Sequence, residues 1–418
     1  MTTASHAAFD AIVVGTGPGG ATVARELSAQ RKKVLMLERG RDAPVDHSLR
    51  KQAGALRMSF VGRGIPVIRG VTLGGTSMLY YATAFDPPLE MFRAHGIELS
   101  EEVAEIKREL PIARFPDHAL GPRARRIMAS AQELGYAWEK LAKFVHPEKC
   151  DGGVPHEAKW NARAFVRDAQ RDGAELEIGA RVERVLIEDG AAVGVEYKRG
   201  GSVRRAYADR VILSAGGVGS PIILRASGVD NVGEGFFCDP LVIVNGAVAD
   251  IDGPWEAPMA AGVHMADDGY MLTDLSHAPY LYWPFTAQRL RFDRLFAHPR
   301  TLSIMVKVKD TIGGRISSRG RVRRIFAPED YARLKHGGER ARTILKNAGA
   351  RHLFRFGVTA AHPGGSVRVG DALDSNLRSE IENLYVCDCS VIPEPWGLPP
   401  TFTLIALGKR LARHLAQV

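Results

Sequence analysis

The hydrophobic and polar positions of the first forty residues predict a strand, a helix and a second strand in succession. Residues 11–14 form a short, apolar, β-branched run, which is typical of a parallel strand buried on both faces. We expect a helix over about residues 21–29 and a second strand over residues 33–37, which ends in Glu38. This order indicates a βαβ unit.

Strand-like patterns dominate the middle of the chain. From residue 175 the chain reads as a β-meander that enters a buried strand at 210–214, and a helix is expected to open at Pro221. Between residues 240 and 326, long alternating runs are typical of an antiparallel sheet with one face in water. The aromatics of residues 280–285 fit core packing, or the lining of an apolar pocket.

Helical patterns flank this region on both sides. Charged helices are expected over about residues 101–136, with prolines as breaks, and another helix leads through residue 169. An amphipathic helix is expected at 328–350, and a helix at 401–415 follows a strand at 383–387.

Three glycines stand in GxGxxG spacing between the first strand and the first helix. Gly15 permits a tight turn, Gly17 lets the backbone approach a pyrophosphate, and Gly20 allows the helix to pack closely on the strand. The helix would direct its free N–H groups and its positive dipole end at the phosphates. Glu38 is placed to hydrogen-bond the adenosine ribose, and this acid favours FAD or NAD over NADP. A purely structural βαβ turn is the alternative.

Two further glycine-rich turns bear on the same site. The turn from Gly74 to Ser77 is flexible and rich in donors, which fits a loop around phosphate or ribityl oxygens or an ordinary glycine turn. The turn from Ser214 to Pro221 follows a buried strand, and we expect it to pack against the first motif.

Length, charge and cysteine usage narrow the function class. The 418 residues suggest two or three domains. The net charge of +9 is spread along the chain and belongs to no nucleic-acid module, so we expect solvated basic surface, with an anionic substrate or membrane surface as alternatives. The four cysteines form no CxxC pair or metal-ligand spacing, and the sequence has no signal peptide or membrane-spanning run. These features predict a reduced, cytoplasmic protein with, at most, peripheral membrane contact.

Together these stretches resemble the glucose–methanol–choline (GMC) oxidoreductases, a family of FAD enzymes. GTGPGG with LERG resembles the nucleotide motif, GVTLGGTS the flavin loop, and VILSAGGVGSP a further signature. HPGGSVRVG with NLYVCDCSVIP resembles the C-terminal signature, and CDGGVPHEAKWNARAF resembles a segment of long-chain alcohol oxidases.

The resemblance implies an α/β fold. It consists of a discontinuous Rossmann-like FAD/NAD(P)-binding domain (residues 1–90, 160–240 and 355–418), a helical and loop insertion (91–159), and an α+β substrate domain on an antiparallel sheet (241–354). It also implies FAD rather than NAD as the cofactor. The implied cofactor-binding residues are Gly15, Gly17, Pro18, Gly19, Gly20, Glu38, Arg39, Gly74, Gly75, Thr76, Ser77, Val182, Ala215, Gly216, Asp388, Cys389, Pro400 and Thr401, with no metal ligand.

Family members oxidise an alcohol to a carbonyl while hydride passes to flavin N5, and His362 stands at the position of the catalytic histidine. An imidazole suits a base for the hydroxyl proton because it titrates near neutrality. The leading expectation is therefore oxidation of a small, apolar alcohol, with oxygen, a quinone or another carrier as the electron acceptor.

The chain also departs from the family pattern. Pro399 stands where the family usually has a second His or Asn, and Cys238-Asp239-Pro240 replaces the common Asp-His-Pro. The chain is short for the family, chiefly in the substrate domain. Two alternatives follow: reduction or formation of a carbon–carbon double bond in a lipid or isoprenoid, with Tyr80 or Tyr81 supplying a proton, or a flavoprotein without catalysis.

Overall fold

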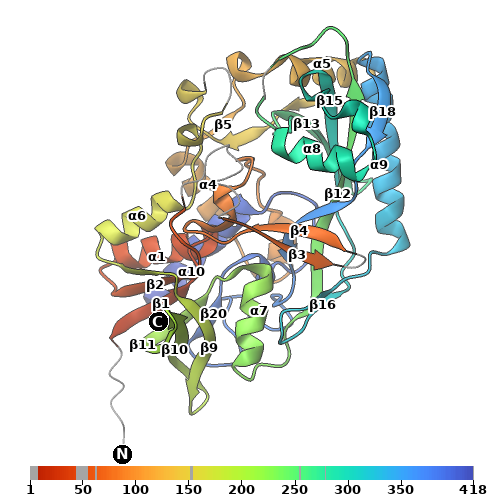
Figure 1. Ribbon diagram of the computed structural model, residues 1–418. Coiled ribbons are helices and arrows are strands. Elements are labelled where there is room, and N and C mark those ends of the chain that lie inside the picture. The colour runs from red at the N-terminus through yellow and green to blue at the C-terminus, as the bar shows by residue number, and fades with distance from the viewer. Residues whose placement is uncertain are drawn as a thin grey trace, which may run out of the picture.

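The computed structural model describes residues 8–43, 55–61, 64–150, 154–253, 256–277 and 279–417, apart from the side chains of 279–281. Figure 1 shows two sheets: the first lies in the lower half with α1, α7 and α10, and the second lies in the upper right with α8 and α9. The helices are α1 (Pro18–Ala29), α3 (Leu89–Arg93), α4 (Ser100–Glu109), α5 (Pro122–Glu133), α6 (Arg163–Arg171), α7 (Gly216–Ala226), α8 (Pro279–Gln288), α9 (Pro328–Asn347) and α10 (Thr401–Gln417).

The first sheet holds the predicted βαβ unit. Its strands are, in spatial order, β8 (Glu175–Ile178), β2 (Val34–Glu38), β1 (Phe9–Val14), β11 (Ser202–Leu213), β10 (Ala191–Arg199) and β9 (Arg181–Glu188), with β20 (Leu384–Val386) also paired to β11. β1 lies parallel to both β2 and β11, and every residue of β2 is buried. The apolar runs of the sequence are therefore strands covered on both faces.

The helix α7 begins at Gly216, five residues before the expected start at Pro221. Asp388 explains the difference, because its Oδ2 accepts hydrogen bonds from the backbone N–H of Gly216 (2.8 Å) and from the hydroxyl of Ser220 (2.5 Å). A carboxylate at a helix N-terminus satisfies unpaired N–H groups and favours the helix dipole. Since this cap comes from a residue far along the chain, local sequence does not reveal it.

The second sheet is mainly antiparallel and supports the other side of the molecule. Its strands are, in spatial order, β3 (Leu56–Val61), β4 (Ile65–Gly70), β19 (Thr359–Gly364), β12 (Glu234–Ala247), β15 (Thr301–Val308), β14 (Tyr270–Asp274), β13 (Ala261–Met265) and β6 (Glu139–Lys140). Shorter strands are β16 (Gly314–Ile316) and β18 (Arg351–Arg355), both paired to β12, β17 (Val322–Arg323), paired to β16, and the separate pair β5 (Ile112–Arg114) and β7 (Ala142–Phe144).

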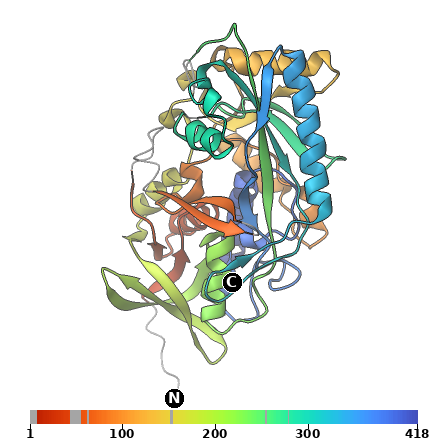
Figure 2. The same cartoon turned by 45° about the vertical axis from the view of Figure 1, so that its right-hand side comes forward.

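The expectation of one water-exposed face on this sheet is wrong. All residues of β15 and β14 are buried. The even positions Val242, Ile304 and Val306 pack in one core cluster with α9, which Figure 2 shows along the outer side of the sheet. The odd positions Ile243 and Met305 pack in a second cluster on the opposite face. Alternation along these strands therefore separates two buried environments rather than core from solvent.

The aromatic run at 280–285 lies in α8 rather than in a strand. Tyr282 is fully buried in the second cluster, Phe285 lines a cavity, and Trp283 is exposed. Among the described residues no helix has the length and hydropathy needed to span a bilayer, and no group of three or more His, Cys, Asp or Glu side chains could hold a metal ion.

Candidate active site

A cavity of about 670 Å³ extends from the loops at the carboxyl ends of β1 and β11 to the inner face of the second sheet. The glycines of the first motif form one end. A Cβ on Gly15, whose φ is +101°, would lie 2.3 Å from the carbonyl oxygen of Ser214, and one on Gly20 would lie 2.2 Å from the oxygen of Gly15. A Cβ on Gly17 would meet no protein atom within 4 Å. Gly15 and Gly20 thus allow close packing, whereas Gly17 faces open space that suits a pyrophosphate.

Glu38 ties this loop to β2 and also lines the cavity. Its Oε2 accepts hydrogen bonds from the backbone N–H (3.1 Å) and the hydroxyl (2.7 Å) of Thr16, and its Oε1 accepts one from the N–H of Gly40 (2.6 Å). Oε1 keeps a lone pair, which a ribose hydroxyl could use. The acid therefore shapes the loop and remains available to the nucleotide.

Two arginines give this end of the cavity a positive wall. Arg39, which was expected here, and Arg69, which sequence reasoning missed, both line the cavity. The Nε of Arg69 is buried and has no hydrogen-bond partner among the residues that the structure describes. Burial together with repulsion from Arg39 and Arg57 lowers the pKa of Arg69 to about 10. An unpaired buried guanidinium donor in such a wall fits an anionic ligand such as a dinucleotide phosphate. The only signal in the sequence was that Arg69 directly precedes a glycine-rich turn.

The Gly74–Ser77 turn joins the same end of the cavity. Gly74 has a φ of +85°, and its N–H donates to the hydroxyl of Thr16 (3.1 Å), which connects this turn to the first motif. The hydroxyl of Ser77 donates to the oxygen of Gly74 (2.6 Å) and accepts from the N–H of Ala162 (3.0 Å). Gly75, Thr76 and Ser77 line the cavity, whereas Gly74 supports them from behind.

Asp388 orders the turn at Cys389–Val391, which follows β20. Besides capping α7, its Oδ1 accepts hydrogen bonds from the backbone N–H (2.8 Å) and the hydroxyl (2.6 Å) of Ser390. These four bonds use the lone pairs of the carboxylate, so its side chain orders the protein rather than a ligand. Other predicted residues that line the cavity are Pro18, Gly19, Val182, Ala215, Gly216, Cys389, Pro400 and Thr401, whereas Gly20 does not line it.

His362 lies on β19 in the wall of the same cavity. Its Nδ1 is 2.8 Å from the Oδ2 of Asp239 on β12. The Nζ of Lys307 on β15 donates to that same oxygen at 3.1 Å and lies 3.4 Å from Nδ1 of His362. β12 is paired with both β19 and β15, so three adjacent strands bring these side chains together.

The surroundings of His362 fix its protonation. Burial and the charge of Lys307 lower the pKa of His362, and Asp239 opposes that shift. A neutral imidazole whose Nδ1–H donates to Asp239 carries its lone pair on Nε2. The side chains of Asp239 and Lys307 are 3% and 2% exposed, and their opposite charges neutralise each other. The arrangement therefore favours a neutral imidazole whose basic nitrogen is Nε2.

Sequence reasoning did not assign Asp239 and Lys307 to the site. Asp239 was noted only as part of an unusual Cys-Asp-Pro triplet. Lys307 stands in an alternating strand, where a lysine ordinarily indicates a solvent-facing position. Their pairing depends on the order of strands in the sheet, which the local pattern does not contain.

Tyr80 and Tyr81 both line the cavity. The hydroxyl of Tyr80 donates to the backbone oxygen of Trp160, and burial raises the pKa of Tyr80 well above its ordinary value. That proton is engaged and weakly acidic, which disfavours Tyr80 as a proton donor. Pro399 also lines the cavity and offers no side-chain donor or acceptor.

Beyond His362 the wall of the cavity is mainly apolar. Side chains from β12, β15, α8 and two loops surround it: Leu241, Ile243, Met259, Leu275, Phe285 and Met305. These residues belong to the second cluster of the inner sheet face. This part of the cavity suits a hydrocarbon group.

Comparison with known proteins agrees with this picture. A family model described as GMC oxidoreductase, in its N-terminal part, matches residues 9–241, and the corresponding C-terminal model matches residues 321–408. An uncharacterized GMC-type oxidoreductase of Mycobacterium tuberculosis is 26% identical over 96% of this chain and 75% of its own length. A long-chain-alcohol oxidase of Arabidopsis thaliana is 22% identical over 98% of this chain and 68% of its own length.

The fold has solved counterparts. The crystal structure of pyridoxine 4-oxidase from Mesorbium loti superposes with a TM-score of 0.78 at 18% sequence identity, over 98% of this chain and 99% of that one. A formate oxidase of Aspergillus oryzae superposes with a TM-score of 0.72 at 16% identity, over 99% of both chains. The expected fold class, a Rossmann-like domain with a sheet-rich second domain, is confirmed.

Proposed function

We propose that this chain, which belongs to the GMC oxidoreductase family of FAD-dependent enzymes, oxidises an apolar alcohol with His362 as the base. Family membership makes FAD the cofactor, as expected from the sequence, and makes the chain an oxidoreductase rather than a flavoprotein without catalysis. The glycine cradle, Glu38 and Arg69 are the residues that would hold the dinucleotide. Bound FAD supplies the acceptor for hydride from the alcohol carbon.

One observation carries the proposal. The imidazole of His362 lines the same cavity as the nucleotide motif, and Asp239 fixes its Nδ1 at 2.8 Å. Nε2 is therefore the nitrogen available to accept the hydroxyl proton of a substrate. As the proton arrives, Asp239 stabilises the imidazolium, in the manner of a carboxylate that orients a catalytic histidine.

Lys307 completes the arrangement. Lys307 offsets the pull of Asp239 on the imidazole proton, and burial together with Lys307 keeps the pKa of His362 below its ordinary value. Pro399 contributes no polar group, so His362 both anchors the hydroxyl and accepts its proton.

The apolar wall supports the substrate class. The apolar side chains Leu241, Ile243 and Met305 lie on the strands that also carry Asp239 and Lys307. The long-chain-alcohol oxidases among the relatives have this substrate class in their names. Burial of a hydrocarbon chain against such side chains gives roughly 25 cal/mol per Å² of apolar surface. We propose a primary or secondary alcohol on a hydrocarbon framework, with oxygen, a quinone or another carrier accepting the electrons.

The test is the visible spectrum of the anaerobic holoenzyme during addition of alcohols of increasing chain length. Loss of the oxidised flavin band with apolar alcohols, and much slower loss in His362→Ala with equal FAD content, is expected. Reoxidation by oxygen or by a soluble quinone then identifies the acceptor. If no alcohol bleaches the band while an enone reoxidises chemically reduced enzyme, the double-bond alternative replaces this proposal.

A further inference from the structure

A second polar group lies in the apolar part of the cavity. His277 follows β14 and is 6% exposed, and its side chain lines the cavity. Its Nε2 is buried without any hydrogen-bond partner among the described residues. An unsatisfied buried polar atom is costly, so its position beside a ligand cavity calls for a ligand.

The surroundings of His277 hold it firmly in place. Its backbone oxygen accepts a hydrogen bond from Nε2 of His298. Its ring lies edge-on to Phe356, with 5.2 Å between the ring centroids and 64° between the planes, and 6.3 Å from the ring of Tyr282. The imidazole is therefore fixed by packing and by its backbone, while its Nε2 has no hydrogen-bond partner in the described part of the chain.

His277 stands at the opposite end of the inner sheet face from His362. The distance can be counted along β15. At one position Lys307, which contacts His362, pairs with Leu241 and Met271. Four residues earlier, the backbone oxygen of Ser303 accepts a hydrogen bond from the N–H of Leu275, two residues before His277. At about 3.3 Å per residue these two rows are roughly 13 Å apart. Leu241, Ile243 and Met305 cover the interval between them. The cavity thus has a polar group at each end and hydrocarbon side chains between.

The chemistry of the far end selects for a neutral ligand. Burial and the neighbouring His298 lower the pKa of His277 to about 3, so the ring is uncharged near neutrality. A neutral imidazole offers one N–H donor and one acceptor, which match a hydroxyl or a carbonyl group. The uncharged ring itself brings no positive charge to a carboxylate, so it matches a neutral oxygen function better.

We propose that His277 binds a second, neutral oxygen function at the far end of the substrate, so that the substrate is an apolar alcohol with a hydroxyl or keto group at its remote end. This inference rests on the proposed alcohol oxidation for the direction of the substrate. The hydroxyl to be oxidised lies at His362, the hydrocarbon framework lies along the inner sheet face, and the second oxygen lies at His277.

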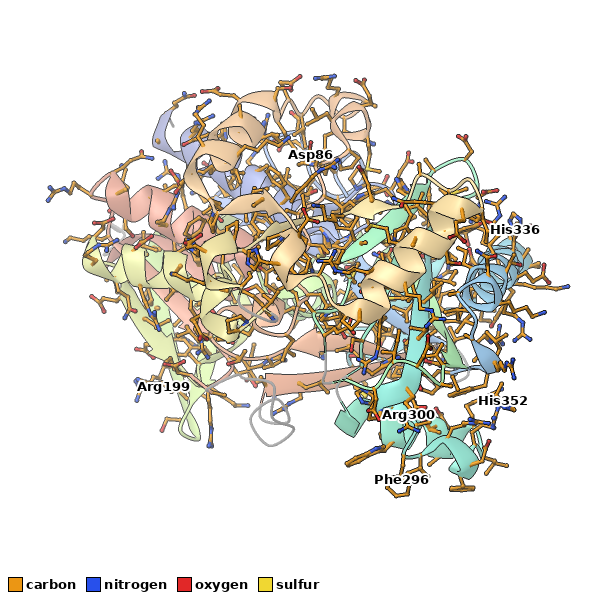
Figure 3. All side chains as sticks on the ribbon, turned by 90° about the horizontal axis from the view of Figure 1, so that it is seen from above. Asp86, Arg199, Phe296, Arg300, His336 and His352 are labelled. Carbon is orange, nitrogen blue, oxygen red and sulfur yellow. The ribbon has the colours of Figure 1, made fainter. Side chains whose placement is uncertain are left out.

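The test compares a straight-chain α,ω-diol with the primary alcohol of the same length over a series of chain lengths. With the wild-type holoenzyme, the diols are expected to show a preferred length at which kcat/KM exceeds that of the monoalcohol. His277→Phe keeps the ring volume and removes both nitrogens, and it should lower the diol-to-monoalcohol ratio about tenfold, as expected for one buried hydrogen bond. His336→Phe, on the outer helix α9 (Figure 3), is the matched control and should leave the ratio unchanged.

A binding measurement separates this inference from the proposed function. Calorimetric titration of the holoenzyme with an α,ω-diketone and with the monoketone of equal length requires no oxidation, and the diketone should bind about tenfold more tightly only when His277 is present. Equal affinities, or the same loss for both ketones in His277→Phe, would overturn the role of His277. Failure of every alcohol to bleach the flavin would instead overturn the proposed function and leave this binding result standing.

Discussion

Replacement of Asp239 by asparagine tests the site at its least expected residue. The side chain keeps its size, but an amide in place of the carboxylate can donate to Nδ1 of His362. The hydrogen bond to Nδ1 is 2.8 Å in the native protein. An amide donor there would place the imidazole proton on Nε2, which is the nitrogen that accepts the substrate proton in the proposed reaction.

The expected kinetic effect is large. Loss of a correctly oriented base costs on the order of 10² to 10⁴ in rate, so we expect flavin reduction by the best alcohol to fall about 10³-fold in Asp239→Asn. The substitution also leaves Lys307 buried without its anion. A broken buried ion pair costs about 3 kcal/mol or more, and we expect the lower end because burial already lowers the pKa of Lys307 and favours loss of its proton.

The assay is anaerobic stopped-flow reduction of the flavin, with FAD content and thermal unfolding measured on the same preparation. His362→Gln and the double variant Asp239→Asn/His362→Gln complete a double-mutant cycle. If Asp239 acts through His362, the double variant should be no slower than the slower single variant. A folded, FAD-loaded Asp239→Asn enzyme that reduces at the native rate, or two effects that multiply, would refute the orienting role.

Three further outcomes are expected. Gly17→Val should purify without FAD and melt at the temperature of FAD-free wild-type protein, because a Cβ at this position meets no protein atom within 4 Å. Gly19→Ala, whose Cβ would lie 2.2 Å from the oxygen of Cys387, should melt below FAD-free wild-type protein. Retained FAD in Gly17→Val would contradict this prediction. Burial lowers the pKa of His277 to about 3 in the folded protein against 6.5 ordinarily, so the unfolded protein takes up this proton first as the pH falls. The stability that this difference contributes is complete above pH 6.5 and is lost as the pH falls toward 3, so the free energy of unfolding of His277→Phe should fall less steeply over this range. The same acid dependence in both proteins would contradict the prediction. Lys409→Met should lower the free energy of unfolding by about 1–3 kcal/mol in urea titrations, since it removes the cation that joins Glu26, Glu105 and Glu109 at 2.9 Å each, and an unchanged midpoint would show the cluster to be energetically neutral.

The sequence predicted those parts of the structure that depend on residues close together in the chain. The strand, the glycine turn and the helix from Phe9 to Ala29 could be predicted because close packing and ligand approach constrain consecutive residues. His362 was singled out by resemblance to a family signature, and its part in the chemistry remains a prediction. FAD and the fold class, expected on the same basis, are confirmed by the family match.

Several of the features that sequence reasoning missed depend on partners far along the chain. The start of α7 is set by Asp388, and the orientation of His362 by Asp239 on a neighbouring strand. Lys307 looks like a surface lysine until the strands are paired. Alternation of side-chain types along a strand indicates that its two faces differ, but it does not show that α9 covers the second face.

The C-terminal segment gives the molecule an order of assembly. The carbonyl oxygen of Cys387 lies against Gly19, α10 packs along α1 with Gly408 close to Thr22, and β20 adds to the edge of β11. The glycine loop of the first motif is therefore supported by residues that the ribosome adds long after the loop itself. During translation the first strand and helix keep apolar surface and an open strand edge until residues 384–408 have emerged. A chain that stopped before residue 384 would therefore leave the first glycine loop without this support.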